Sequence, residues 1–173
     1  MPGQSQAKYR QKSSEYAIRL REKQKLKRIF GLTEKQFRIN FTKSNNQPGV
    51  TGDNLITNLE RRLDNAVYRL GFLSSRSEAR QFVNHGHVMV NGKKVNIPSY
   101  SVKEGDVIEV RDKSKEMALI VEALALKERD VPEYIEVDFK KMIAKFKRVP
   151  ELSDVPYPAI MEPNLVVEYY AKN

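Results

Sequence analysis

The stretch that most constrains the fold runs from Ser74 to Val95 and reads SSRSEARQFVNHGHVMVNGKKV. Ser75 and Glu78 have the spacing of a capping box, which predicts the start of a short helix. Gly86 suits the left-handed position that follows a helix end. Asn91-Gly92, between two apolar runs, is typical of a type I′ turn and predicts a β-hairpin. A short helix followed by a hairpin is therefore the central unit of the expected fold.

The predicted helix and hairpin carry several basic and amide side chains. Two arginines lie one turn apart on the predicted helix, two amides lie beside them, and two lysines follow the turn. Arginine makes planar, bidentate contacts with phosphate, so a helix and hairpin with these groups are expected to fit across an irregular RNA backbone. The side chains concerned are Arg76, Arg80, Gln81, Asn84, Lys93 and Lys94.

Helices are predicted on the N-terminal side of this unit. A highly charged helix is expected over residues 14–30, with Gly31 as its stop. Thr33 and Gln36 form a second capping box and open another helix. The clearest helical pattern covers residues 55–70, where apolar residues recur every three or four positions.

Strands and a further helix are predicted on the C-terminal side. Residues 107–111 read as a strand, Ser114 reads as the cap of a helix, and residues 134–148 contain two alternating runs typical of strands. The apolar segment 165–170 fits either a helix or a strand, and its pattern does not decide between them. The polar segment 43–52, which contains Pro and Gly, predicts a loop and a boundary.

The net charge of the 173-residue chain is +9 and is unevenly distributed. Residues 1–38 hold 11 Lys and Arg against 3 acidic residues, residues 61–94 hold 7 against 2, and residues 116–173 hold 8 against 11. Separate basic blocks favour a binding face for a polyanion. No apolar run approaches the roughly 18 residues of a membrane-spanning helix, and no secretory signal is recognisable. We therefore expect nucleic acid as the partner, with no membrane.

Catalytic and metal sites have little support in the sequence. The chain has no cysteine, which excludes disulfides, thiolate metal clusters and cysteine nucleophiles. His85 and His87 are the only histidines and lack adjacent acidic residues to complete a zinc site. They could simply end a helix and begin a strand, but we expect one or both to touch phosphate or ribose. Glu60, Asp64 and Glu78 are more simply ion-pair partners or caps, and no nucleotide-binding loop motif occurs. No catalytic residue, cofactor or metal is predicted.

The segment SSRSEARQFVNHGHVMVNGKKVNIPSY resembles the small RNA-binding module named after the small-subunit ribosomal protein S-four. The module alone is shared by several families. Four flanking segments narrow the resemblance to the ribosomal protein family itself, of the bacterial or organellar type. They are SEYAIRLREKQKLKRIFGLTEKQF (14–37), VTGDNLITNLERRLDNAVYRLGF (50–72), GDVIEVRDKSK (105–115) and NLVVEYYAKN (164–173). The match covers nearly the whole chain.

The resemblance implies an α+β fold in two domains. Residues 1–52 are expected to form a basic arm and a helical domain, completed by residues 163–173. Residues 53–162 are expected to form an inserted domain, a small antiparallel sheet packed on helices, with the RNA-binding module at about 61–125. Family members usually carry an N-terminal extension, sometimes with zinc-binding cysteines. This chain begins Met-Pro-Gly-Gln-Ser, as if within that extension's last segment, so we expect a short or truncated start.

The resemblance also implies a function, that of a structural RNA-binding protein of the small ribosomal subunit. The family binds a multi-helix junction in the 5′ domain of small-subunit ribosomal RNA and nucleates assembly. It contacts the small-subunit ribosomal protein S-five, at an interface linked to decoding accuracy. It also contacts messenger RNA where the messenger enters the ribosome, a role carried here to Lys8 and Arg10. No cofactor and no homo-oligomer are expected, and the expected place is the ribosome, in the bacterial cytoplasm or in an organelle.

We predict that RNA is bound by the basic side chains of the two basic blocks, together with amide and imidazole groups of the module. They are Lys8, Arg10, Lys12, Arg19, Lys23, Lys25, Lys27, Arg28, Lys35, Arg38, Arg61, Arg62, Arg69, Arg76, Arg80, Gln81, Asn84, His85, His87, Lys93 and Lys94. Two alternatives share the same module. An RNA-modifying enzyme would act on ribosomal RNA, and a stress-related protein would cofractionate with large ribosomal subunits. Neither alternative explains the segments 14–37 and 164–173.

Overall fold

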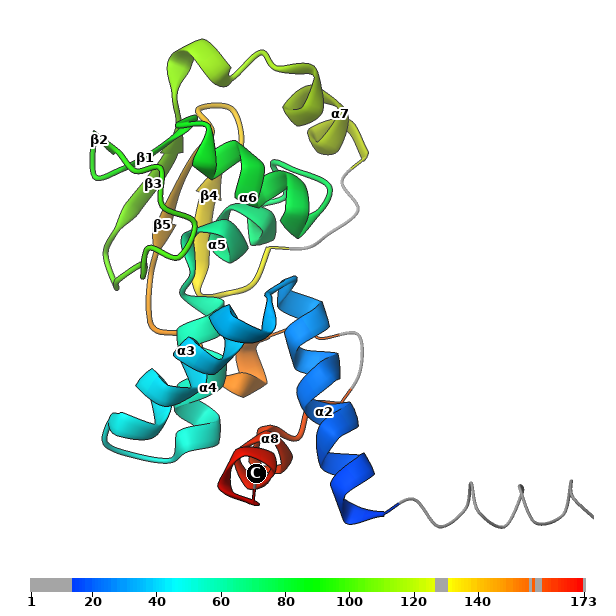
Figure 1. The fold of residues 1–173 in the computed structure, drawn as a ribbon. Helices are drawn as coiled ribbons and strands as arrows, with labels where there is room; N and C mark the ends of the chain where they lie inside the picture. The colour runs from blue at the N-terminus through cyan, green and yellow to red at the C-terminus, as the bar shows by residue number, and fades with distance from the viewer. Residues whose placement is uncertain (1–13, 127–130, 156, 158–159, 173) are drawn as a thin grey trace, which may run out of the picture.

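The computed structural model describes residues 14–126, 131–155, 157 and 160–172. They form two lobes, one helical and one built around a five-stranded antiparallel sheet (Figure 1). The predicted α+β class is confirmed. Within this part of the chain, no helix is both long and apolar enough to cross a membrane. The predicted contacts of Lys8, Arg10 and Lys12 fall outside the described residues.

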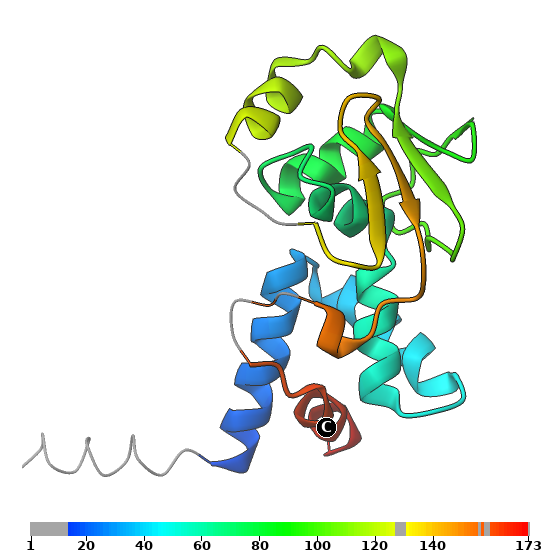
Figure 2. The ribbon, with the colours of Figure 1, turned by 180° about the vertical axis from the view of Figure 1, so that it is seen from behind.

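In the part of the chain that the structure describes, the helical lobe contains four α-helices and a short 3-10 turn. They are α2 (Glu15–Phe30), α3 (Glu34–Asn46), α4 (Thr51–Glu60), η2 (Leu152–Asp154) and α8 (Pro163–Lys172). The C-terminal α8 lies between α2 and α4 in both views, so the end of the chain completes the N-terminal lobe (Figures 1 and 2). The segment 165–170, for which the sequence left two possibilities, is helical.

Local capping explains where α2 and α3 begin and end. The Ser14 hydroxyl accepts a hydrogen bond from the first turn of α2 at 3.1 Å. Gly31 ends that helix with φ 64°, a left-handed conformation that glycine adopts without strain. Thr33 and Gln36 make both hydrogen bonds of the predicted capping box. The helix α3 then runs through residues 43–46, which the sequence wrongly predicted as loop.

The sheet lobe packs two helices against one face of its sheet (Figure 1). Its helices are α5 (Leu63–Arg69), α6 (Arg76–Asn84) and α7 (Ala118–Leu126), with the 3-10 turn η1 (Asp112–Ser114). Its strands are β1 (Val88–Val90), β2 (Lys93–Lys94), β3 (Val107–Val110), β4 (Ile135–Asp138) and β5 (Ile143–Phe146), in the order β2-β1-β3-β5-β4. Phe82 and Val83 of α6 share a buried core with Ile108 and Phe146 of the sheet.

The predicted helix–hairpin unit is confirmed. Asn91 and Gly92 have φ values of 51° and 79°, as a type I′ turn requires, and Val90 pairs with Lys93 across that turn. The prediction that Ser114 caps a helix is wrong, because α7 begins only at Ala118. The buried Ser114 hydroxyl instead lies 2.7 Å from Nδ1 of His87.

The prediction of one helix over residues 55–70 is also wrong. The helix α4 ends at Glu60 and α5 begins at Leu63, because Arg62 has an extended backbone and bridges to Ser101. The apolar residues of α4 therefore enter the core of the helical lobe, while those of α5 enter the core of the sheet lobe. The boundary expected between residues 52 and 53 stays a prediction. Because α4 packs with the helical lobe, we propose the boundary at residues 61–62.

Candidate nucleic-acid interface

The predicted RNA-binding residues differ widely in exposure. Those fully on the surface are Arg28, Lys35, Arg38, Gln81, Asn84, His85, Lys93 and Lys94. Those half-buried are Arg19, Lys25, Lys27, Arg61, Arg76, Arg80 and His87. Three of them, Lys23, Arg62 and Arg69, are buried. Each lobe carries its own exposed group, and the buried members lie within and between the lobes.

The exposed group of the helical lobe lies along α3. Glu34, Lys35, Arg38, Ile39, Thr42, Lys43 and Asn46 line an open groove of ≈ 770 Å³. Glu34 is neutralised by Lys23 and Lys27 of α2. Lys35, Arg38 and Lys43 form no ion pair with any described acidic residue. The groove therefore offers net positive charge to an anionic ligand.

Lys43 was missing from the sequence prediction. Residues 43–52 were expected to form a loop, so Lys43 had no assigned face. On the helix that the structure shows, Lys35, Ile39 and Lys43 follow one another at four-residue spacing and share a face. Extending the helical pattern by one turn would have identified it.

The α-helical basic residues of α2 are largely engaged within the protein. Arg19 pairs with Glu168 of α8 at 3.1 Å and with Glu15 at 3.3 Å. Lys25 pairs with Glu22 at 2.8 Å and donates to the Ile160 carbonyl at 3.0 Å. These contacts attach α2 to the C-terminal segment. The charges of Arg19 and Lys25 therefore stabilise the fold, in addition to any role in binding a ligand.

The exposed group of the sheet lobe gathers where α6 meets the hairpin. Burial lowers the pKa of His87, and the neighbouring His85, Arg111 and Lys94 lower it further. The Arg111 backbone N–H bonds to the His87 carbonyl and the Lys94 side chain reaches Gly86, so both cations lie beside this imidazole. Lys93, Lys94 and Arg111 have no acidic partner among the residues that the structure covers. This second surface also suits phosphate.

Gly86 lets Lys94 approach α6 closely. A Cβ atom built at this glycine would lie only 2.3 Å from Cε of Lys94. The glycine also has φ +80°, which L side chains rarely adopt. Arg111, which the sequence prediction missed, is held here because its backbone N–H donates to the His87 carbonyl at 2.9 Å. That contact depends on strand pairing, so no local sequence signal identified it.

The two histidines have structural contacts of their own. The His87 ring lies 4.8 Å from the Phe82 ring and shares a hydrogen bond with Ser114. The His85 ring is exposed and lies 6.3 Å from that of His87. Over the described residues, no group of three or more His, Asp or Glu side chains could hold a metal ion.

Several predicted arginines point into the junction between the lobes. The buried Glu60 carboxylate, at the end of α4, accepts hydrogen bonds from Arg69 at 2.9 Å and from the Tyr134 hydroxyl at 3.0 Å. Asn65 donates to the same carboxylate at 2.9 Å. Burial opposes the charge of Arg69, but the Glu60 carboxylate more than compensates and raises the pKa of Arg69. The Arg69 guanidinium is thus kept charged in the interior.

A second carboxylate organises the other side of the junction. Asp64 accepts two hydrogen bonds from Arg62, both at 3.1 Å, and one from Arg80 at 3.2 Å. Arg80 also donates to the carbonyl of Phe30, at the end of α2, at 3.1 Å. Arg80 therefore connects the sheet lobe to the helical lobe.

Arg76 is stacked between aromatic rings. Its guanidinium carbon lies 4.3 Å from the Tyr68 ring centroid and 5.1 Å from that of Phe30, and its Nε donates to Asn65 at 3.0 Å. Burial lowers the pKa of Arg76, and the charge of Arg69 lowers it further. The RNA contacts predicted for Arg62 and Arg69 stay predictions. Because those side chains are only 6% and 7% exposed, we leave them out of the interface proposed below.

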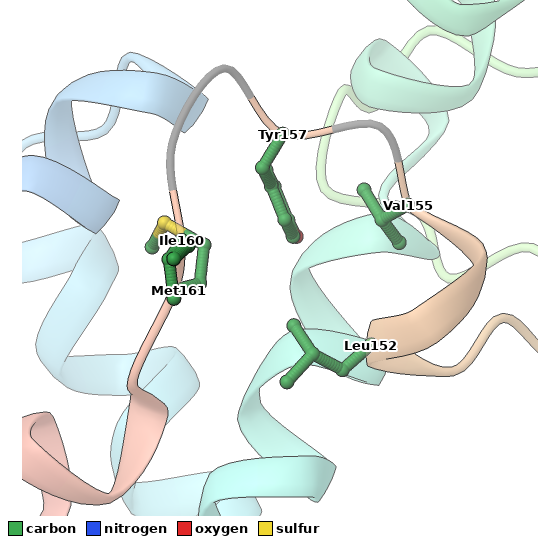
Figure 3. Close-up of a pocket in the computed structure, with 5 residues that line it drawn as sticks. All are labelled: Leu152, Val155, Tyr157, Ile160 and Met161. Carbon is green, nitrogen blue, oxygen red and sulfur yellow. The ribbon is translucent and has the colours of Figure 1, made fainter.

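An apolar hollow of ≈ 490 Å³ lies beside this junction and is lined by Leu152, Val155, Tyr157, Ile160 and Met161 (Figure 3). These side chains carry no charge. The Tyr157 hydroxyl is buried and forms no hydrogen bond with the described residues. The described lining offers no group for phosphate binding or catalysis, and we keep the hollow apart from the candidate interface.

Comparison with known proteins gives two family matches in tandem. The family described as "Ribosomal protein S4/S9 N-terminal domain" matches residues 1–60, and the "S4 domain" matches residues 61–108. The two matches meet at the break between α4 and α5.

Curated relatives match along the whole chain. "Small ribosomal subunit protein uS4" of Ruegeria pomeroyi is 61% identical over 99% of this chain and 84% of its own length. The proteins of the same name from Dinoroseobacter shibae and from a Jannaschia species are each 60% identical with the same coverage.

Proposed function

The chain belongs to the small ribosomal subunit protein uS4 family, and from that premise we propose that it binds a multi-helix RNA junction early in assembly of the small subunit. It is a structural RNA-binding protein of the small ribosomal subunit rather than an enzyme, and it acts in the ribosome. The RNA that we propose is the junction in the 5′ domain of small-subunit ribosomal RNA.

One observation carries this proposal: each lobe presents its own cationic surface, whose lysines and arginines form no ion pair with the acidic residues that the structure describes. The helical lobe offers the α3 groove with Lys35, Arg38 and Lys43. The sheet lobe offers the surface with Lys94 and Arg111 near the two histidines. Two such surfaces on one body favour an RNA whose phosphates reach both lobes at once. A multi-helix junction presents phosphates in that way, whereas a single duplex presents one continuous cylinder.

Phosphate contacts at the two surfaces would provide the affinity. Neutralising phosphates with Lys and Arg releases counterions, so binding should weaken steeply with salt. Side chains cannot read sequence in the deep major groove of A-form RNA, so selection should rest on the shape of the RNA. The proposed interface contains the exposed predicted residues of both lobes, with Lys43 and Arg111 added. Arg76 and Arg80 contribute chiefly through the junction between the lobes.

Family resemblance supports further contacts. We propose that Lys8 and Arg10 in the N-terminal arm contact messenger RNA where it enters the ribosome. We also propose an interface with the small-subunit ribosomal protein S-five, through which the protein affects decoding accuracy. Crosslinking from Lys8 in assembled ribosomes would test the first contact. Its absence from messenger crosslinks would count against that role.

The test of the main proposal is a binding titration of the purified chain with a transcript of the 5′-domain junction, set against a plain duplex of equal length. Both RNAs are titrated over a series of salt concentrations. We expect a preference for the junction that persists at physiological salt. Equal affinities that disappear together as salt rises would mean nonspecific polycation binding and would overturn the proposal.

A further inference from the structure

The lobes have separate hydrophobic cores but share a buried polar junction. Leu55, Ile56 and Leu59 belong to one core, whereas Leu63 and Leu70 belong to the other. The chain crosses between the two lobes twice. It passes from α4 to α5 at residues 61–62, and it returns in the segment between β5 and η2 (Figure 2). Two covalent connections alone allow hinge motion, so the non-covalent contacts across the junction decide how firmly the lobes are held.

Glu60 connects the two lobes at one point. It is the last residue of α4 in the helical lobe, and its side chain is 0% exposed. Among the described residues, the donors to its carboxylate are Arg69, Asn65 and Tyr134, and all of them come from the sheet lobe. Tyr134 is itself completely buried and follows Glu60 by 74 residues. RNA cannot reach either side chain.

Arg80 and Arg76 connect the lobes at a second point, at the end of α2. Arg80 spans from Asp64 to the Phe30 carbonyl, and Arg76 lies over the Phe30 ring. Gly31 lies beside this contact, where a Cβ atom would be in ordinary van der Waals contact with the Arg80 guanidinium at 3.6 Å. Two separated attachments resist rotation in a way that one alone does not.

A buried network of charges is seldom the most stable way to fill an interface. Desolvation offsets much of the attraction, and apolar residues of similar volume often stabilise as well or better. Charges and hydrogen bonds, however, have strict geometry, which specifies one relative orientation. The buried polar contacts between the lobes are therefore suited to fixing the relative orientation of the lobes.

We propose that Glu60 and Tyr134 are positioning residues for RNA recognition, which fix the spacing between the α3 groove and the cationic surface of the hairpin. This inference rests on the proposed function, since it explains how a protein with two binding surfaces selects RNA by shape. The α3 groove and the cationic surface of the hairpin can bind one RNA junction together only while the two lobes keep a single relative orientation.

Two buried substitutions test the proposal without touching the RNA-binding surface. Tyr134→Phe removes one hydroxyl and keeps the ring that packs edge-on against Phe146. Glu60→Gln removes the carboxylate charge from a position that RNA cannot reach. Simple electrostatics predicts that losing a negative charge tightens RNA binding. A positioning role predicts the opposite for the junction transcript.

For both variants we expect the affinity ratio of junction to duplex to fall by about tenfold, as for one lost hydrogen bond to a charged group. The affinity for the duplex alone should stay unchanged or rise. Glu136→Gln is the matched control, because it removes the same charge from an exposed position on β4 and should leave the ratio unchanged. An unchanged ratio in folded Tyr134→Phe would overturn the proposal, even when Glu60→Gln does not fold.

A distance measurement adds a readout that stability alone would not move. The chain has no cysteine, so labels can be placed by Asn45→Cys on α3, outside the groove lining, and by Lys140→Cys after β4, both exposed positions. We expect one narrow distance in the otherwise unchanged protein and a broadened distribution in Tyr134→Phe. Equally narrow distributions would contradict the inference. The proposed function would be contradicted instead if the protein without the buried substitutions showed a narrow distance between the labels but no preference for the junction RNA over the duplex.

Discussion

Glu60 and Arg69 pair across the break between α4 and α5, with 2.9 Å between Nε of Arg69 and Oε1 of Glu60. Their side chains are 0% and 7% exposed, and they lie nine residues apart in the chain. The pair therefore spans the point where one predicted helix becomes two. It also accounts for an arginine of the basic block that lies inside the protein.

We predict that Arg69→Met destabilises the protein strongly. The substitution leaves the Glu60 carboxylate buried without its cation, which costs about 3–5 kcal/mol in comparable buried pairs. Urea denaturation measures the free energy of unfolding. The control is Lys115→Met, which breaks an ion pair whose Asp112 side chain is 94% exposed and should change little. Equal losses of unfolding free energy in the two variants would contradict the role assigned to the contacts between the lobes.

Much of the fold could be predicted because its signals are local. The caps at Ser14, Thr33 and Ser75 and the turn at Asn91-Gly92 each depend on residues within one turn of one another. The break at Arg62 could not be predicted, because the apolar pattern continues through it. Its extended backbone depends on a bridge to Ser101, far along the chain.

The candidate site was predictable to the same extent. Exposed Lys93 and Lys94 follow from the hairpin, whose register is local. The inward direction of Arg69 and Arg80 was not predictable from charge patterning. The number of basic residues in a segment does not tell which of them point into the protein. Their partners, Glu60 and Phe30, reach them only through the packing of the lobes.

A pair of glycine substitutions separates backbone strain from RNA contact. Gly86→Ala and Gly71→Ala both place a side chain at positive φ, +80° and +78°, and each should lower stability by about 1–2 kcal/mol. Only Gly86→Ala pushes against Lys94, since nothing lies within 4 Å of a Cβ at Gly71.

We therefore predict that RNA affinity falls for Gly86→Ala and stays unchanged for Gly71→Ala, when both are measured at a temperature where each is folded. Filter binding with the junction transcript gives the affinities. Loss of binding in both variants, or in neither, would contradict the importance assigned to the close approach of Lys94 at Gly86.

The salt dependence of binding should report individual phosphate contacts. We predict that Lys94→Ala lowers the slope of log affinity against log salt by about 0.7–0.9, the value for one phosphate neutralised. Lys145→Ala is the comparison, because this exposed lysine lies opposite Glu136 on the neighbouring strand. Its slope should match that of the unchanged protein, and a Lys94→Ala slope equal to both would disprove the contact.

The stability of the protein should fall at mildly acidic pH. Burial, with the nearby His85, Arg111 and Lys94, holds the pKa of His87 below its usual range, so the unfolded chain binds more protons at this site. The contribution of His87 is complete above the unfolded pKa of about 6.5 and is lost as the pH falls through the folded value.

Urea midpoints measured between neutral and acidic pH for the unchanged protein and for His87→Gln test this prediction. We expect the unchanged protein to lose more stability than the variant across this range. Parallel pH profiles would show that His87 does not carry the dependence.

The central claim is that one RNA engages both lobes at once, and lysine acetylation footprinting of the complex tests it most directly. Lys35 on α3 and Lys94 on the hairpin are both exposed in the free protein, so each can be modified and quantified by mass spectrometry. With one equivalent of junction RNA, we predict that both lysines become protected together, at the same RNA concentration. Protection of Lys35 without Lys94, or of Lys94 without Lys35, would contradict the account.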